Sequence, residues 1–267
     1  MEVLYGVHPV EEALRAGSRR FDHVCFARER AGTHVDQRLQ RVIDACREAG
    51  VRLRFEPREH LTRLAKTPSH QGVVAVVREK ATLELEDLLD APEDGRARLF
   101  LALDGVEDPQ NLGALLRSAD GAGADGVVLT ERRSAPLSPV AIKASAGAAE
   151  HVPIARVVNL SRALEQMKER NLWCVGLDER GTMPYDEFDF TSNTVIVLGR
   201  EGAGLHDLVK RHCDHLLRIP MAGKVASLNV SVAGAVVLYE AARQRRAGQM
   251  KAASPPKKKE KKGLGLS

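Results

Sequence analysis

The chain has 267 residues, of which 43% are hydrophobic and 28% charged, and its formal net charge is +4 at pH 7. This composition is ordinary for a folded protein, and no apolar run approaches the roughly 18 residues that a membrane-spanning helix needs. The first residues also lack the basic and then apolar segments of a secretory signal peptide. We therefore expect a cytoplasmic protein of one large or two modest domains, with no membrane anchor.

The positive charge is concentrated at the end of the chain. Residues 243–267 carry nine Lys or Arg and one Glu, a balance of +8, whereas the preceding 242 residues have a balance of −4. Low hydrophobicity, two prolines and many lysines predict a disordered basic tail over residues 247–267. The four cysteines have no CxxC spacing, so we expect free buried thiols and no metal site.

The first 80 residues predict a small α/β domain. Helices are expected near 8–16, over 35–49 and after Pro57, and strands at 23–27, 51–56 and 72–78. This front domain is mildly basic, which is compatible with RNA contact and equally with an ordinary charged surface. Residues 81–96 are acidic and contain Pro92 and Gly95, so they predict a linker with one helical turn around 85–89.

The pattern restarts in residues 97–246 with fully apolar strands at 97–104, 126–130, 172–177, 194–199 and 215–220. Helices are expected near 111–122, 139–148, 160–170, 205–211 and 227–246. Continuous apolar strands that alternate with helices indicate a parallel sheet covered on both faces. Trp173 falls in one of these strands and is expected in the core.

Two polar segments follow strands of this predicted sheet. Asn111 and Arg117 open the helix after the first strand, and Glu201 lies in the glycine-rich turn after the strand at 194–199. The carboxyl ends of parallel strands are the usual place for a binding crevice. Each residue also has a plain explanation: Asn111 as a helix cap, Arg117 as a surface charge, and Glu201 as a carboxylate near a helix start. We expect Glu201 either to pair with Arg117 or to contact the substrate.

A third segment, IPMAGKVASLNVSVAGA at 219–235, is the most specific of the three. Ser227 and Asn229 are ordinary capping residues for the helix that follows. Capping alone does not explain why three short polar side chains alternate with apolar ones after a Pro-Met-Ala-Gly turn. The three segments together predict one divided active site.

Their order, spacing and residues resemble the three motifs of the SpoU (TrmH-like) RNA ribose 2'-O-methyltransferases of the SPOUT superfamily. The front segments YGVHPVEEAL (5–14) and the QG of HQGVVAV (70–76) resemble the small RNA-binding domain of many such enzymes. GAAE (147–150) and the third motif resemble the bacterial 23S rRNA guanosine 2'-O-methyltransferases that modify the P loop of the peptidyl-transferase centre.

The resemblance implies a parallel-sheet SPOUT catalytic domain with a C-terminal trefoil knot, preceded by a small α/β (L30e/L7Ae-like) RNA-binding domain. It implies S-adenosylmethionine as methyl donor, a homodimer, and RNA as substrate, with 23S rRNA foremost. It carries the catalytic roles onto Asn111, Arg117, Glu201, Ser227 and Asn229. It assigns main-chain contacts with the cofactor to Gly199, Ile219 and Leu228. The alternatives are a tRNA ribose methyltransferase and a non-catalytic RNA-binding or ribosome-assembly protein.

The chemistry limits the role of Arg117. A guanidinium does not lose its proton in a protein, so we expect Arg117 to hold the phosphate beside the target ribose rather than to act as a base. The acceptor of the hydroxyl proton stays open between a phosphate oxygen and water. Because the reaction is an in-line displacement, positioning should matter more than a strong oxyanion site.

Overall fold

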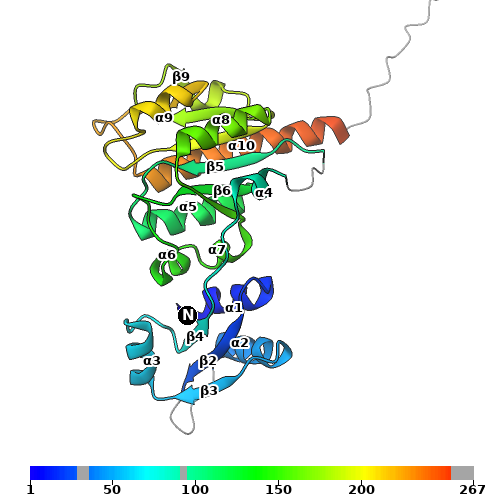
Figure 1. Ribbon diagram of the computed structural model, residues 1–267, viewed down its shortest axis with the longest axis vertical. Helices are drawn as coiled ribbons and strands as arrows, with labels where there is room; N and C mark the ends of the chain where they lie inside the picture. The colour runs from blue at the N-terminus through cyan, green and yellow to red at the C-terminus, as the bar shows by residue number, and fades with distance from the viewer. Residues whose placement is uncertain (29–35, 91–94, 254–267) are drawn as a thin grey trace, which may run out of the picture.

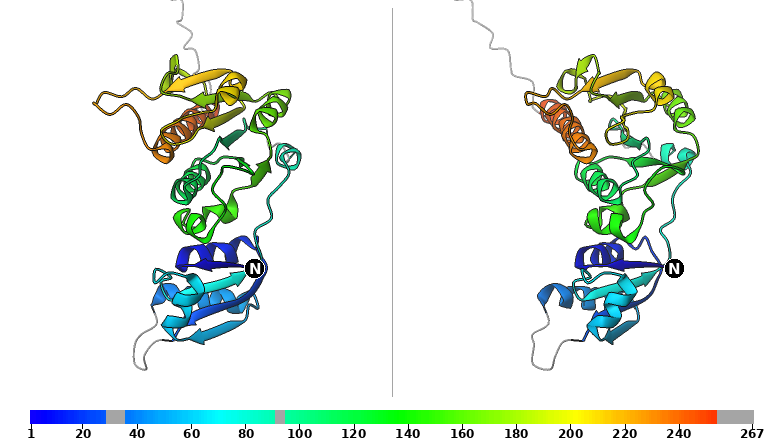
Figure 2. Two further views of the ribbon diagram at one scale, coloured as in Figure 1. Left: turned by 60° about the vertical axis from the view of Figure 1, so that its left-hand side comes forward. Right: turned by 90° about the vertical axis from the view of Figure 1, so that its left-hand side faces the viewer.

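The structure is a computed structural model that describes residues 1–28, 36–90 and 95–253 (Figure 1). It contains two sheets in two lobes joined by one crossing of the chain (Figures 1 and 2). Within the described ranges no helix is long and apolar enough to cross a membrane.

The front lobe is a four-stranded sheet with helices on both of its faces. Its strands are ordered β1-β4-β2-β3; β4 runs antiparallel to β1 and β2, and β2 runs parallel to β3. The elements are β1 (Glu2–Tyr5), α1 (Val7–Ala16), β2 (Phe21–Ala27), α2 (Gln37–Glu48), β3 (Leu53–Glu56), α3 (Arg58–Ala65) and β4 (Val73–Val77). All the predicted elements of this lobe are present, and β1 is an addition to them.

The second lobe is built on a seven-stranded sheet in the order β7-β6-β5-β10-β8-β11-β9, in which every pair is parallel. Its strands are β5 (Leu99–Leu103), β6 (Gly126–Thr130), β7 (Ile154–Val157), β8 (Trp173–Leu177), β9 (Met183–Pro184), β10 (Thr194–Leu198) and β11 (His215–Arg218). Its helices are α4 (Leu85–Leu89), α5 (Pro109–Gly121), α6 (Pro139–Ala144), α7 (Ala148–His151), α8 (Leu160–Glu169), α9 (Asp207–His212) and α10 (Val230–Ala253), with a short 3-10 turn at Tyr185–Glu187. The predicted parallel α/β sheet is confirmed.

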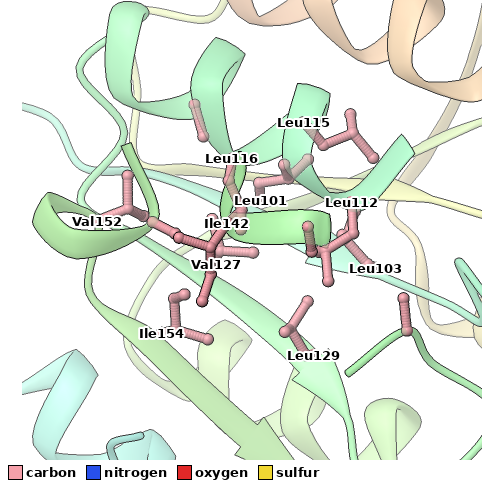
Figure 3. Packing of buried hydrophobic residues seen from close by; sticks show 14 of the residues in the cluster. Leu101, Leu103, Leu112, Leu115, Leu116, Val127, Leu129, Ile142, Val152 and Ile154 are labelled. Atoms are coloured by element: carbon pink, nitrogen blue, oxygen red, sulfur yellow. The ribbon is translucent and has the colours of Figure 1, made fainter. Parts of the chain in front are cut away.

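Alternate residues of the central strands enter two different apolar layers, as the pleat of a strand requires. Leu101 and Leu103 of β5 pack with Leu112 and Leu115 of α5, which Figure 3 shows from close by. Phe100, the neighbour of Leu101, belongs to the opposite layer, which contains residues of α4, α8 and α9. Both faces of the sheet are therefore covered, and only its ends are open for a site.

The order of the strands places a site at one particular point. The chain runs outward from β5 to β6 and β7, and then returns so that β10 pairs with the other side of β5. The order of the strands reverses between β5 and β10, and the loops that leave their carboxyl ends diverge there. Crevices of doubly wound sheets form at such switch points. The first and second polar motifs follow β5 and β10.

Several predictions need correction. Trp173 is 48% exposed rather than buried, because it begins β8 at the rim of the sheet. The helix expected at 139–148 is two helices, α6 and α7, broken where Ala146 and Gly147 take positive φ angles of 52° and 97°. Helix α10 continues to Ala253, so residues 247–253 are helical rather than disordered, and the rest of the predicted tail lies outside the described residues.

The acidic linker also does more than connect the lobes. Leu85, Leu88 and Leu89 of α4 are buried in the layer that contains Phe100. Leu83 pairs with β7, where its backbone N–H donates to the carbonyl oxygen of Ile154 at 2.8 Å. The predicted helical turn is confirmed, and it packs on the second lobe.

Candidate active site

Three segments meet at the switch point, each fixed by local chemistry. Helix α5 begins after Asp108, whose carboxylate accepts a hydrogen bond from the backbone N–H of Gln110 at 2.9 Å, with Pro109 in the first helical position. The loop after β10 carries Glu201. The loop before α10 carries Ser227 and Asn229. The structure thus gathers residues more than a hundred positions apart in the chain.

Asn111, Glu201 and Asn229 form a closed hydrogen-bonded ring. Asn111 Nδ2 donates to Glu201 Oε2 at 3.1 Å. Asn229 Nδ2 donates to Asn111 Oδ1 and to Glu201 Oε1, both at 3.0 Å. Each oxygen of the carboxylate is thus held by one amide, so the three motifs converge as predicted.

The cap of α10 decides which way these amides point. Asn229 Oδ1 accepts from the backbone N–H of Ser231 at 2.9 Å, so this atom must be the oxygen. The NH₂ group of Asn229 then faces Asn111, which must turn its own oxygen toward it and its own NH₂ group toward Glu201. The cap of α10 and the geometry of the ring are therefore one arrangement, in which the side chain of Asn229 takes part in both.

The turn after β10 is a tight glycine-rich loop. Arg200 and Gly204 exchange backbone hydrogen bonds at 3.0 and 2.9 Å, and Gly202 and Gly204 have positive φ angles of 73° and 67°. A Cβ atom on Gly199 would lie 2.2 Å from the carbonyl carbon of Gly204. No residue other than glycine fits at position 199 without displacing the loop.

Beside the ring lies a cleft of about 340 Å³, within the usual size range of small-molecule pockets. Gly199, Ile219 and Leu228, the three predicted cofactor-binding residues, all line it, together with Glu201 and Ser227. Leu177, Leu198 and Val230 add apolar surface. The cleft can take a flat, partly apolar ligand whose polar edge faces main-chain groups.

Arg117 and Ser227 do not join the ring. Arg117 is exposed on α5, and neither side chain makes a hydrogen bond or ion pair within the part of the chain that the structure describes. Within one subunit Arg117 and Glu201 therefore do not form a pair, which was one of the two expectations for Glu201; contact with the substrate stays a prediction. A helix turns about 100° per residue, so six positions place Arg117 on a different face of α5 from Asn111.

Comparison with known proteins agrees with this site. The sequence profile of the SpoU rRNA Methylase family matches residues 98–239, and that of the RNA 2'-O ribose methyltransferase substrate binding domain matches residues 3–83. The chain belongs to the SpoU rRNA methylase family. Members of this family are RNA methyltransferases, so the catalytic class expected from the three motifs is confirmed.

Individual SpoU relatives cover nearly the whole chain. A putative TrmH family tRNA/rRNA methyltransferase, YacO from Bacillus subtilis, is 41% identical, over 91% of this chain and 96% of its own. The 23S rRNA (guanosine-2'-O-)-methyltransferase RlmB of Escherichia coli is 40% identical, over 91% and 99%. Among solved structures, the SpoU methyltransferase AviRb from Streptomyces viridochromogenes, in complex with AdoMet, is 28% identical with a TM-score of 0.77, over 92% and 91%.

The sequence prediction missed two charged residues that line the cleft beside the ring. Asp178 and Lys210 both line it, and Lys210 Nζ lies 2.6 Å from Asp178 Oδ2. Burial raises the pKa of the Asp178 carboxyl, but hydrogen bonds from Lys210 and from the Arg180 backbone outweigh burial, so the pKa falls below its ordinary 3.8. Asp178 directly follows β8, so the carboxyl-end rule applied to Asn111 would also have found it.

This ion pair predicts a pH-dependent stability. Because the folded-state pKa of Asp178 is depressed, its stabilisation is complete well above 3.8 and is lost as the pH falls through the folded-state value. We expect Asp178→Asn to lower the free energy of unfolding by about 1 kcal/mol at neutral pH, and the difference from the unmodified protein to shrink at acid pH. Urea unfolding from neutral to acid pH measures the difference in unfolding free energy, with Asp120→Asn at an exposed position as the control. A difference that stays constant with pH would contradict the assignment.

Among the residues described, no three or more His, Cys, Asp or Glu side chains are placed to hold a metal ion. The four cysteines are free; Cys25, Cys46 and Cys174 are buried and Cys213 is half-buried.

Proposed function

We propose that this protein transfers a methyl group from S-adenosylmethionine to the ribose 2'-hydroxyl of a guanosine in 23S rRNA, within the P loop of the peptidyl-transferase centre. The ring of Asn111, Glu201 and Asn229 at the edge of a glycine-lined cleft carries the proposal. The likeness to RlmB over nearly its whole length supports the choice of RNA and base. We place this activity in the cytoplasm.

The cleft fits the proposed methyl donor. Gly199 brings main chain close to the cleft, Ile219 and Leu228 line it, and its mixed polar and apolar lining suits an adenosyl group. AviRb, of similar fold, binds AdoMet. When bound, S-adenosylmethionine supplies an electrophilic methyl group on a positively charged sulfur. Gly199, Ile219 and Leu228 would hold its adenosyl part through their main-chain groups.

The protein's part in the reaction is positioning. A bond would form between the ribose oxygen and the methyl carbon, the carbon–sulfur bond would break to leave a neutral thioether, and the hydroxyl proton would pass to a phosphate oxygen or to water. Glu201, fixed by two amides, and Ser227 at the cleft would orient the hydroxyl in line with the methyl group. Arg117 stays protonated and would hold the neighbouring phosphate.

We also propose that the active protein is a homodimer, formed through α10 and the loop before it. Residues 221–228 are all exposed, and this loop extends away from the rest of the lobe (Figure 2). Val225, Val232 and Tyr239 are 70%, 48% and 51% exposed, and Tyr239 lies against Gly121 at the end of α5. Val232 and Tyr239 are seven positions apart on α10 and so share one face of it, and large exposed apolar side chains on one face indicate an interface. Arg117, exposed on the same helix α5, would then reach the site of the partner subunit.

The dimer proposal predicts that Val232→Asp produces monomers. The carboxylate would be buried against apolar surface without a partner, at a cost of several kcal/mol. Light scattering after size-exclusion chromatography measures the mass. Val158→Asp, at a residue 76% exposed beyond β7, should leave the mass unchanged. A Val232→Asp protein that stays dimeric would place the interface elsewhere.

The remaining family features also stay proposals. We propose residues 1–80 as the RNA-binding domain, 81–96 as the linker, 97–246 as the catalytic domain and 247–267 as a basic tail. We propose the trefoil knot on the likeness to the SpoU family.

Mapping of ribose methylation across total RNA tests the function. Cells that lack the protein should lose one 2'-O-methylguanosine from the P loop of 23S rRNA, and the purified protein with S-adenosylmethionine should restore it on unmodified 23S rRNA. Loss of a tRNA mark instead would support the tRNA methyltransferase. No lost mark, and no transfer by the purified protein, would leave the non-catalytic RNA-binding alternative.

A further inference from the structure

The two lobes meet through a buried charged contact. Arg19, which follows α1, donates from Nε to both carboxylate oxygens of Glu150 in α7, at 2.9 and 2.8 Å. The two side chains are 1% and 0% exposed. Ser18 Oγ donates to Glu150 at 2.9 Å, and Glu2 in β1 accepts from Arg19 Nη1. One carboxylate of the catalytic lobe is thus held by two side chains of the front lobe.

Further contacts surround this pair. Lys80 Nζ donates to the carbonyl oxygens of Ala149 and Val152 at 2.5 and 3.0 Å, at the end of α7. Lys143 Nζ, from α6, donates to the carbonyl oxygen of Ser69 at 2.6 Å and lies 5.0 Å from the ring centre of Tyr5. All of them involve the short helices α6 and α7, which face the front lobe in Figures 1 and 2.

Gly147 lets α1 approach this surface closely. Its φ angle is 97°, and a Cβ atom there would lie 2.5 Å from both Cβ and Cγ of Glu12 in α1. The GAAE segment is thus a docking surface: its glycine admits α1, and its glutamate binds Arg19.

The same surface is packed tightly onto the helix that carries Asn111. A Cβ atom on Gly113 of α5 would lie 2.4 Å from the carbonyl oxygen of Ala141 and 2.5 Å from Cβ of Ala144, both in α6. Contacts therefore run without a gap from the front lobe through α6 and α7 to α5 and the active site.

A buried ion pair is a poor way to gain stability, because removing two charges from water offsets most of their attraction. It is an effective way to fix an orientation, because a guanidinium whose Nε–H is shared by the two oxygens of Glu150 and whose Nη1 is held by Glu2 tolerates little sliding or rotation. Apolar contacts alone would allow several nearby arrangements. The contact between the lobes is therefore better suited to setting geometry than to adding stability.

We propose that Glu150 and Arg19 are positioning residues for the RNA substrate: they hold the front lobe at one distance and orientation from the methyl-transfer site. This inference rests on the proposed function, in which the front lobe binds RNA. The protein then measures the separation between the RNA element bound by the front lobe and the target ribose. The protein would select one nucleotide by this separation, together with the contacts that the nucleotide makes at the methyl-transfer site.

The first test measures the orientation and does not depend on activity. Spin labels are attached to cysteines introduced at exposed Arg41 in α2 and exposed Glu169 in α8. Burial raises the pKa of the thiols of Cys46, Cys174 and Cys213 to about 11, 12 and 12, so these native thiols react slowly at neutral pH. Pulsed electron spin resonance should give one narrow distance distribution within a subunit.

The informative variant replaces both charges, because a single replacement leaves one charge buried alone and can prevent folding. Arg19→Met with Glu150→Leu keeps the volume, and Glu2, the other partner of Arg19, keeps some contact with water because its side chain is 12% exposed. The melting temperature should therefore fall by no more than about 5 °C, whereas the distance distribution should become about twofold wider. Glu48→Leu on the exposed end of α2 is the control. Equal widths in the double variant and the unmodified protein would overturn the proposal.

The second test uses transcripts of the P-loop region of 23S rRNA in which base pairs are inserted one at a time beside the target. For the unmodified protein, kcat/KM should fall about tenfold or more with insertion, and for the double variant by less than about threefold. The same dependence in both proteins would refute positioning by this pair. If the unmodified protein methylates none of the transcripts, the proposed function fails, and the distance measurement alone decides whether the pair fixes the lobes.

Discussion

Asn229→Ser should reduce methyl transfer about 100-fold while changing the free energy of unfolding by less than about 1 kcal/mol. Serine caps helices as well as asparagine does, so the start of α10 should persist. Serine has no NH₂ group, so both hydrogen bonds from Asn229 Nδ2, to Asn111 and to Glu201, are lost. Glu201 is then held by one amide instead of two, and its carboxylate can rotate away from the position that orients the ribose.

The measurement is kcat on 23S rRNA with saturating S-adenosylmethionine, beside urea unfolding of the same preparations. Asn159→Ser is a matched control, because Asn159 caps α8 by accepting from the backbone N–H of Arg162 at 3.2 Å and takes no part in the ring. It should leave kcat unchanged. If Asn229→Ser retains more than about half of kcat, the ring has no role in positioning.

Local patterns predicted the central strands well, because strands such as Leu99–Leu103 are buried on both faces and apolar throughout. Two of the three missed strands lack this signal. Ile154–Val157 is short and contains Arg156, and Met183–Pro184 has only two residues. Trp173 is exposed although it lies in an apolar run. Such a run predicts a buried strand, but it does not show at which residue the buried part of the strand begins.

The site was predicted only as a set of residues. The motifs named Asn111, Glu201 and Asn229, but which of them touch depends on how β5 and β10 pair, and no local pattern encodes that pairing. Within one subunit, two amides hold Glu201, and the pair with Arg117, one of its two expected contacts, is not formed. The contact between Arg19 and Glu150 spans the two lobes and has no sequence pattern at all.

Alanine substitutions at three glycines, which differ in how much space surrounds them, test whether the cleft binds S-adenosylmethionine. In Gly199→Ala the new methyl group would meet backbone atoms 2.2 and 2.3 Å away, in Gly204 and Leu205, and backbone cannot rotate aside as a side chain can. The loop must move, which we expect to cost about 3 kcal/mol of unfolding free energy and to weaken S-adenosylmethionine binding by about 100-fold or more.

Two other glycines calibrate this result. Gly204 has a positive φ of 67° but only an ordinary contact at 3.8 Å, so Gly204→Ala should cost about 1 kcal/mol through backbone strain alone. Gly223 meets nothing within 4 Å in its own subunit and has no positive φ, so Gly223→Ala should add no strain within the subunit and should leave the affinity for S-adenosylmethionine unchanged. Urea unfolding at one protein concentration and titration calorimetry with S-adenosylmethionine measure the series. Because Gly199 and Gly204 both line the cleft and Gly199→Ala must displace this loop, an affinity in Gly199→Ala within about threefold of the unmodified protein would mean that the cofactor binds elsewhere.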